Sequence, residues 1–270
     1  MKILITGHKG FIGQNLRLAL LNDHELFGYE WDSELLPDVK GFDWVIHLGA
    51  ISDTTERDVD KIISQNYEFS KWLYNECNRK DVNFQYASSA SVYGTSENFN
   101  EDAPKNPQSP YAWSKYLFDR WLWNLPYHKI IVQGFRYFNV YGPYEEHKEN
   151  QASPITKFTK QAKETGKIQL FEDSDQYLRD FVFVGDICKA HIQLLSSQES
   201  GLFNIGSGNT TSFQEIAEII AKKENATIEY IPMPKILEGQ YQKYTCADIT
   251  KLKNLIKIDF TTVEDYINGL

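Results

Sequence analysis

Cysteine is scarce in this chain of 270 residues, which has only three. Cys77, Cys188 and Cys246 lie far apart, without the paired spacing that structural zinc sites use, and three cysteines cannot form a disulfide framework. We therefore expect no metal centre, and a reduced protein of a cytoplasmic kind.

Long apolar runs and an excess of positive charge are also lacking. No run approaches the roughly 20 apolar residues that a membrane-spanning helix requires. The chain opens on a short β-like run rather than on a signal peptide. With 28 Lys and Arg against 37 Asp and Glu, the net charge is −9. An acidic surface repels nucleic-acid phosphates, so we expect neither a membrane nor a nucleic-acid partner.

Short β-branched runs alternate with amphipathic helical patterns, which is typical of parallel βαβ units. Strands are expected near residues 2–6, 24–30, 43–48, 82–87, 129–137, 168–171, 181–183 and 228–231. Helices are expected near residues 11–21, 59–79, 110–124, 154–164, 185–196 and 212–223. The sequence thus predicts an α/β fold with a doubly wound parallel sheet and a smaller mixed α/β substrate domain.

Three glycines, Gly7, Gly10 and Gly13, follow the first predicted strand and open the first helix. Glycine lets the backbone turn sharply and approach a pyrophosphate, which binds at the helix N-terminus. This placement favours a dinucleotide site over an ordinary glycine-rich turn. We therefore expect a Rossmann-type dinucleotide-binding domain over residues 1–140. Residues 141–270 would mainly bind substrate, with segments near 184–206 returning to the first sheet.

Glu30 ends the second predicted strand, where such domains place an acid that binds the adenosine ribose. A carboxylate there favours NAD, because it accepts a hydrogen bond from the 2′-hydroxyl and repels a 2′-phosphate. His8 and Lys9 favour the opposite choice, so both NAD and NADP remain open. Only 12 residues separate Glu30 from Asp43, too few for another crossover and strand. We expect one edge strand to be missing and the adenine side to be open.

Tyr111 and Lys115 are four residues apart near the start of a predicted helix, so they share one helix face. Ser89 ends a predicted strand, where its hydroxyl can reach the same edge of the sheet. A phenol has an ordinary pKa of about 10, and a nearby ammonium and an oxidised nicotinamide both favour its ionised form. Tyr111 would then act as the base, Ser89 would position the reacting oxygen, and Lys115 would hold the nicotinamide ribose.

These motifs resemble the extended short-chain dehydrogenase/reductases that act on nucleotide-sugars. The resemblance rests on the glycine loop, HLGA (47–50), SSASVYG (88–94), SPYAWSK (109–115), FRYFNVYGP (135–143) and RDFVFVGD (179–186). Within this group the chain is most similar to the ADP-L-glycero-D-manno-heptose 6-epimerases, through residues 47–58, 135–148, 170–184 and 239–248. Tyr144 departs from the arginine usual there, and the segment 31–42 is shorter and lacks the group's basic residue.

The resemblance assigns roles to residues that spacing alone does not. It implies two acid/base groups, Tyr111 and Lys148, with Ser89 and Lys115 in support. Besides the loop glycines, Glu30, Tyr111 and Lys115, it implies cofactor contacts at Phe11, Ile12, Leu48, Gly49, Ala50, Ser52, Asn66 and Val140. It implies substrate contacts at Ser89, Asn139, Asn150, Lys157, Phe171, Arg179 and Tyr241. Asn150 and Lys157 stand where the group has serine and histidine. Lys148 could instead be a solvated lysine, and Arg179 could form a structural pair with Asp180.

The function implied is epimerisation of an ADP-heptose-like nucleotide-sugar by transient oxidation, with one tightly bound NADP or NAD per subunit. A UDP-hexose 4-epimerase is an alternative. A 4,6-dehydratase is disfavoured, because Ala90 and Ser91 stand where dehydratases carry an Asp-Glu pair. A non-catalytic regulator is disfavoured, because Tyr111 and Lys115 are both present. The resemblance also implies a homo-oligomer, dimeric or larger, and the tryptophans at 113, 121 and 123 are expected in the core or in a subunit contact.

Overall fold

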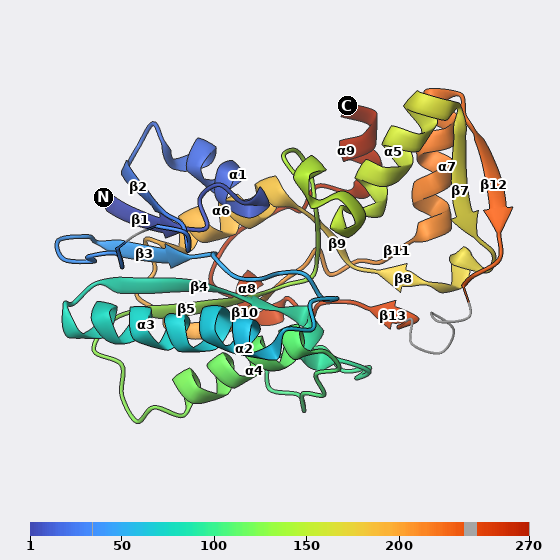
Figure 1. The fold of residues 1–270 in the computed structure, drawn as a ribbon. Coiled ribbons are helices and arrows are strands. Elements are labelled where there is room, and N and C mark those ends of the chain that lie inside the picture. The colour runs from blue at the N-terminus through green and yellow to red at the C-terminus, as the bar shows by residue number, and fades with distance from the viewer. Residues whose placement is uncertain (34, 235–241, 270) are drawn as a thin grey trace.

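The computed structural model describes residues 1–33, 35–234 and 242–269, without the side chains of residues 149 and 150 (Figure 1). The longer elements of its first half are β1 (Lys2–Thr6), α1 (Phe11–Leu20), β2 (Glu25–Tyr29), β3 (Trp44–His47), α2 (Val59–Ile62), α3 (Phe69–Arg79), β4 (Asn83–Ser89), α4 (Pro110–Trp123) and β5 (Val132–Tyr137). The second half contains β6 (Asn139–Tyr141), α5 (Pro154–Thr165), β7 (Lys167–Phe171), β8 (Leu178–Arg179), β9 (Phe181–Phe183), α6 (Val184–Leu194), β10 (Gly201–Ile205), β11 (Thr211–Ser212), α7 (Phe213–Glu224), β12 (Thr227–Ile231), β13 (Tyr244–Thr245), α8 (Thr250–Lys253) and α9 (Val263–Gly269).

The main sheet has six parallel strands in the order β10-β5-β4-β3-β1-β2. Helices α1 and α6 lie on one face and α3 and α4 on the other (Figure 1). Because both faces are covered, the central strands read as continuous apolar runs, and all four residues of β3 are buried. The predicted α/β, Rossmann-type class is confirmed.

Strand β2 forms one edge of this sheet, and its only partner among the described strands is β1. Residues 31–33 and 35–43 form turns and loop. The predicted loss of one edge strand is therefore confirmed, and the physical reason is the short connection from Glu30 to Asp43.

A second group of elements stands beside the carboxyl ends of the main-sheet strands (Figure 1). Strands β7 and β12 pair in parallel, and α5 and α7 pack together beside them around a core that includes Phe158, Leu170 and Ile216. Strand β10 instead returns to the main sheet, in register with β5. The division of the chain into two functional domains stays an interpretation.

Local sequence patterns predicted the position of several elements correctly. The Ser109 hydroxyl accepts a hydrogen bond from the Ala112 amide, and Pro110 is the first residue of α4. The predicted helix over 59–79 is broken by a π-helical stretch, Ile63–Glu68, that its apolar spacing did not reveal. The two-residue strands β8, β11 and β13 were also missed, because they are too short to carry a periodic pattern.

Candidate active site

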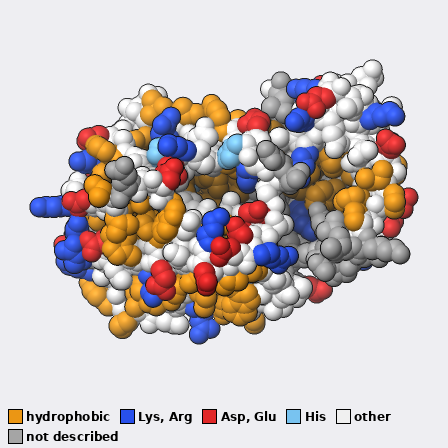
Figure 2. Space-filling model, viewed as in Figure 1, with side chains coloured by type: hydrophobic (Ala, Val, Ile, Leu, Met, Phe, Trp, Pro, Cys, Tyr) orange, Lys and Arg blue, Asp and Glu red, His pale blue; other side chains and the backbone are white. Residues whose placement is uncertain are grey.

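A cleft of about 740 Å³ lies between the main sheet and the second group of elements. Figure 2 shows the surface hollowed between these two parts of the molecule. The lining includes residues far apart in the sequence that were predicted to act together, namely Phe11, Ile12, Ser52, Ser89, Tyr111, Asn139, Val140, Lys148, Lys157, Phe171 and Arg179. Of the other predicted substrate contacts, Tyr241 and the Asn150 side chain lie outside the described residues.

The glycine loop is too tight for side chains at two of its positions. Gly7 has a φ of +70°, which other residues rarely adopt, and a Cβ on Gly13 would lie 2.1 Å from the Gly7 carbonyl oxygen. Helix α1 starts at Phe11, and no side chain caps its N-terminus at Gly10. The first amides of α1 are thus left to bind an external anion, and the loop fits a dinucleotide pyrophosphate.

A smaller cavity of about 110 Å³ continues from this loop. It is lined by Thr6, Gly7, Tyr29, Glu30, Trp31, Gly49, Ala50, Gln65 and Phe69. The Glu30 carboxylate accepts a hydrogen bond from the Lys9 amide at 2.8 Å and lies 3.1 Å from His8 Nδ1. The His8 ring therefore lies beside the Glu30 carboxylate.

Asn66, in the π-helical stretch, is buried and fixes the loop that follows β3. Its amide exchanges two hydrogen bonds with the backbone of Ile51, at 2.8 and 2.9 Å, and donates to the Ser114 hydroxyl at 3.0 Å. A π-helical stretch often marks a functional site. Here it places one amide between the loop that follows β3 and helix α4, which carries Tyr111.

Ser89 and Tyr111 come together from two elements, the end of β4 and the first turn of α4. The Ser89 oxygen accepts hydrogen bonds from the Ser91 amide at 3.2 Å and the Ser91 hydroxyl at 2.9 Å. Burial raises the pKa of Tyr111, and its hydrogen bond with Ser89 offsets part of that rise. The expected lowering of the Tyr111 pKa by Lys115 is not among these effects, so the protein's own groups leave the phenol protonated.

Lys115 is buried one turn further along α4 and donates to the Ala87 carbonyl at 2.9 Å. Burial lowers its pKa to about 8, and the carboxylate of Asp119 acts in the opposite direction. Its ammonium also helps burial to lower the pKa of His47 to about 3, so His47 is neutral. Lys115 is thus held by a backbone carbonyl of β4, and it is not among the described residues that line the cleft.

Lys148 lies in a short 3-10 helix, Glu146–Gln151, and lines the same cleft as Tyr111. Its ammonium is 5.2 Å from the centre of the Phe11 ring, at the start of α1. Burial lowers the pKa of Lys148, and Glu145 acts against that shift. Lys148 is thus half-buried beside the start of α1, and it is not the fully solvated lysine considered as the alternative. Its chemical role stays a prediction.

A structural pair with Asp180 was the alternative considered for Arg179, and the Asp180 carboxylate has other partners. The buried Asp180 carboxylate accepts from the amides of Ser207, Gly208 and Ala247. The Arg179 guanidinium lies 5.8 Å from the Phe213 ring and lines the cleft. Asn139 donates to the Asp180 carbonyl at 3.1 Å, so it is fixed beside Arg179.

The cleft also has lining residues that the sequence did not single out. Tyr177, Phe213, Ile231 and Met233 join Phe171 at its wall. They come from separate loops and strand ends, and no shared motif could have marked them. They make part of the cleft apolar, next to the cations Lys157 and Arg179.

The described residues give no support for a metal site or for a membrane-spanning helix. No group of metal-ligating side chains occurs among residues 1–33, 35–234 and 242–269. Over the same ranges, none of the helices has both the length and the apolar character needed to cross a bilayer.

The fold, the glycine loop and the cleft together define a dinucleotide-binding protein of the Rossmann type. A model of the NAD dependent epimerase/dehydratase family matches residues 3–206, and the chain belongs to this family. It is therefore an enzyme of an NAD-dependent family.

Solved structures agree with this assignment. The ADP-L-glycero-D-manno-heptose-6-epimerase of Helicobacter pylori is 26% identical, with a TM-score of 0.87 over 99% of this chain and 94% of that one. A UDP-N-acetylglucosamine 4-epimerase of Methanobrevibacter ruminantium is 23% identical, with a TM-score of 0.86 over 100% and 99%. A UDP-glucose 4-epimerase of Thermus thermophilus in complex with NAD is 22% identical, with a TM-score of 0.81 over 99% and 98%. The last two show a shared fold alone.

Proposed function

We propose that the protein is a nucleotide-sugar epimerase that acts by transient oxidation of its substrate. The observation that carries this proposal is the cleft itself, which combines Ser89 and Tyr111 from the β4–α4 side with Lys148 from beside α1. Two proton-transferring groups in one cleft suit a reaction that removes hydrogen from one face of a carbon and returns it to the other.

In this mechanism Tyr111 takes the proton of a sugar hydroxyl, while Ser89 holds the same oxygen by a hydrogen bond. NAD, when bound, supplies the reversible acceptance of a hydride. The ketone turns within the cleft, and Lys148 serves the opposite face as the second acid/base group. Lys115 holds the nicotinamide ribose from its place beside Ala87.

The pKa of Tyr111 explains why the base would work only with cofactor in place. Burial raises that pKa, and the Ser89 hydrogen bond alone does not reverse the rise. A positively charged nicotinamide ring would supply the missing stabilisation of the phenolate. Tyr111 would then become basic when the oxidising partner is present.

We propose one NAD per subunit, bound along the edge that runs from the glycine loop to the cleft. Glu30 would accept from the ribose 2′-hydroxyl, and Asn66 would hold the loop that contacts the cofactor. Gly7, Gly10, Gly13, Phe11 and Ile12 would bind the pyrophosphate end. Leu48, Gly49, Ala50, Ser52, Tyr111, Lys115 and Val140 would line the remainder.

For the substrate we propose an ADP-heptose-like nucleotide-sugar. This rests on the similarity to the heptose epimerase and on the cations of the cleft. Arg179 would bind the diphosphate, since a guanidinium matches phosphate oxygens, with Lys157, Asn139 and Phe171 beside it. Asn150 and Tyr241 belong to the proposed contacts by sequence resemblance only. Tyr144 and Lys157 depart from the heptose pattern, so a UDP-hexose 4-epimerase is the second candidate.

The organisation of the molecule fits the same proposal. Residues 1–140, together with β10, would bind the cofactor, and residues 141–270 would mainly bind substrate. We further propose a cytoplasmic homo-oligomer. Trp113 and Leu117 on α4 expose 49% and 37% of their surface, which suits a subunit contact. Trp121 and Trp123 instead pack against the core.

Product analysis by NMR tests the proposal, with ADP-heptose and UDP-hexoses supplied separately to the NAD-loaded enzyme. We expect epimerised heptose, with turnover reduced by orders of magnitude in Tyr111→Phe although NAD remains bound. Lys148→Ala should retain partial oxidation and lose epimerisation. The control is Lys129→Ala, which removes an exposed lysine paired with Asp81. Near-normal turnover of Tyr111→Phe, or a dehydrated product, would refute the mechanism.

A further inference from the structure

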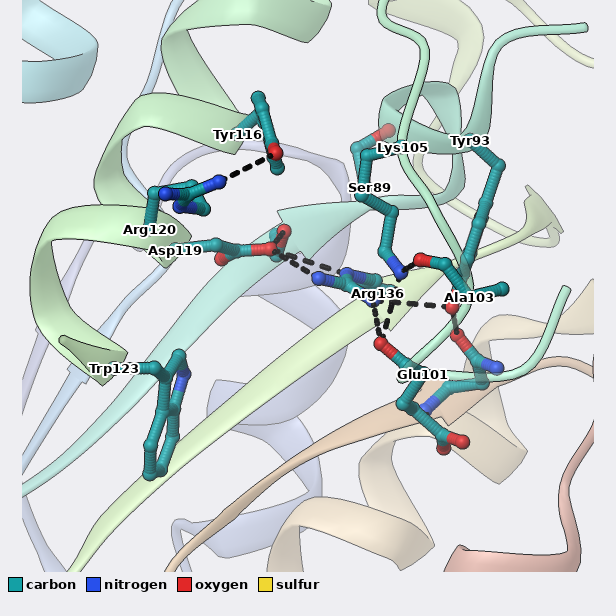
Figure 3. A network of polar contacts seen from close by, with 12 residues as sticks. Ser89, Tyr93, Glu101, Ala103, Lys105, Tyr116, Asp119, Arg120, Trp123 and Arg136 are labelled. Atoms are coloured by element: carbon teal, nitrogen blue, oxygen red, sulfur yellow. Dashed lines mark hydrogen bonds and ion pairs between the residues drawn. The ribbon is translucent and has the colours of Figure 1, made fainter. Parts of the chain in front are cut away.

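A second groove, of about 560 Å³, opens beside helix α4 and shares no lining residue with the cleft described above. Its walls are the loop 101–105, the second half of α4, the start of β10 and the beginning of α8. Figure 3 shows the polar network at its base. The reaction proposed above leaves this groove without a role.

The base of the groove holds one ion pair that is internally satisfied. Arg136 and Asp119 are both buried, and two guanidinium nitrogens each lie 3.1 Å from one Asp119 oxygen. Arg136 also donates to the Tyr93 hydroxyl at 3.2 Å and to the Glu101 carbonyl at 3.0 Å. The two charges of this pair therefore largely balance each other.

Lys105 lies next to this pair without a carboxylate partner in the part of the chain that is described. Its ammonium donates to the carbonyls of Glu101 and Ala103, and lies 4.8 Å from the centre of the Tyr93 ring (Figure 3). Arg136 approaches the same ring at 5.2 Å. Two cations thus share one ring, and the only carboxylate paired with either of them among the described residues is Asp119, which pairs with Arg136.

The charges that face Lys105 come from three elements. Burial, followed by the charge of Arg136, lowers the pKa of Lys105 to about 8, against the effects of Asp102, Asp119 and Glu101. Asp119 is already bound to Arg136. The Glu101 carboxylate accepts a hydrogen bond from the Asn204 amide at 2.8 Å, and burial raises the pKa of Glu101. Its negative charge therefore compensates the Lys105 ammonium only weakly. Asp102 is exposed.

Two further cations stand at the rim of the groove. Arg120 bonds the Tyr116 hydroxyl at 3.2 Å with its guanidinium 5.9 Å from that ring, so its position is fixed. Lys251 lies 5.2 Å from the Phe203 ring. Neither forms an ion pair with any residue in the described ranges. The described lining of the groove thus has four cations against three carboxylates, a net charge of +1, in a protein with a net charge of −9. The cations are Lys105, Arg120, Arg136 and Lys251, and the carboxylates are Glu101, Asp102 and Asp119.

We propose that this groove is a binding site for a small phosphorylated metabolite, with Lys105, Arg120 and Lys251 binding the phosphate. A dianion matches an excess of cations better than a single carboxylate does, and guanidinium groups suit phosphate oxygens. The Tyr116 and Trp123 rings offer apolar surface to the remainder of the ligand. The site stands apart from the epimerase cleft and does not depend on the reaction proposed there.

Sulfate is the probe, because it stays dianionic over the whole pH range used. Its dissociation constant is measured by calorimetry on the NAD-loaded protein at constant ionic strength, between pH 6.5 and 9.5. Binding requires the Lys105 ammonium, so the dissociation constant should rise at least about tenfold as the pH passes 8. Lys105→Arg should bind sulfate with little pH dependence, because its charge does not titrate. Lys105→Met and Arg120→Ala should each weaken binding at pH 6.5 by about tenfold or more.

The control variant is Lys129→Met, a surface lysine outside the groove, which should bind sulfate as the unchanged protein does. Arg120→Ala alters an exposed side chain and keeps the proposal testable if Lys105→Met fails to fold. The proposal is overturned if sulfate affinity is equal in the unchanged protein, Lys105→Met and Arg120→Ala. Tighter binding of succinate than of sulfate would overturn the phosphate assignment.

Discussion

At the scale of single residues, Asp119 connects the candidate active site to the rest of the protein. Its carboxylate accepts from the Tyr86 and Ser88 hydroxyls, both at 2.9 Å, and pairs with Arg136 (Figure 3). It lies one helical turn after Lys115 and raises the pKa of that lysine against the effect of burial. One buried acid therefore fixes α4 against β4 and β5 and favours the charged form of Lys115.

Asp119→Asn removes the charge with little change of shape. Without it the pKa of Lys115 should fall below about 8, because only burial remains. If the reaction needs the ammonium, the alkaline limb of kcat/KM moves to lower pH. The unfolding free energy should fall by about 3–5 kcal/mol, since Arg136 loses its buried partner. A pH profile of kcat/KM and denaturant unfolding check both expectations. The control is Asp81→Asn, at an exposed position. An alkaline limb that does not move would show that Asp119 is structural only.

At the scale of elements, the π-helical stretch before α3 gives the cofactor-side loop its position. Asn66 reaches both the backbone of Ile51 and the Ser114 hydroxyl from this stretch. Ser114 in turn donates to the Tyr111 carbonyl at 2.7 Å, inside the first turns of α4. A loop, a helix and the candidate base are thus joined through one side chain.

Asn66→Ala should therefore cost about 1–3 kcal/mol of unfolding free energy, because the part-buried backbone groups of Ile51 and the buried Ser114 hydroxyl lose their partner. It should also weaken NAD binding, since the loop after β3 is released. Ser64→Ala, in the same stretch but exposed, is the matched control and should change neither quantity. Calorimetric titration with NAD and denaturant unfolding measure the two effects, and unchanged NAD affinity would contradict the positioning role.

At the scale of the whole molecule, the sheet ends at β2, and little covers the adenosine side of the proposed cofactor site. Trp31 lines the small cavity there, packs edge-on against Phe69 at 5.1 Å and remains 46% exposed. The missing edge strand thus leaves one tryptophan at the open side. Aromatic side chains there can stack on a purine ring.

Trp31→Ala should weaken NAD binding by about tenfold or more, because one stacked ring contributes about 1–3 kcal/mol. Binding of nicotinamide mononucleotide, which lacks adenine, should not change. The mass of cofactor retained after purification and calorimetric titration measure the effect. Leu35→Ala, 81% exposed in the same segment, is the control. An equal loss for both ligands would place Trp31 in the fold rather than in adenine recognition.

Much of the fold and part of the site could be predicted because their signals are local. Gly7 is required by its positive φ, and Gly13 by backbone crowding within the same loop. Ser109 and Pro110 mark the start of α4 through bonds between neighbours. The 12 residues between Glu30 and Asp43 were enough to predict the missing edge strand, because chain length limits what can be built.

The remaining features depend on groups that meet only after folding. The direction of the Tyr111 pKa follows from burial, which no spacing in the sequence reveals. The bond from Asn66 to Ser114, the pairing of Asp119 with Arg136 and the effect of Arg136 on the pKa of Lys105 each depend on contacts between distant segments. Motifs identified the residue types able to do the chemistry, whereas packing set their charges and partners, because desolvation and Coulomb interactions act through space.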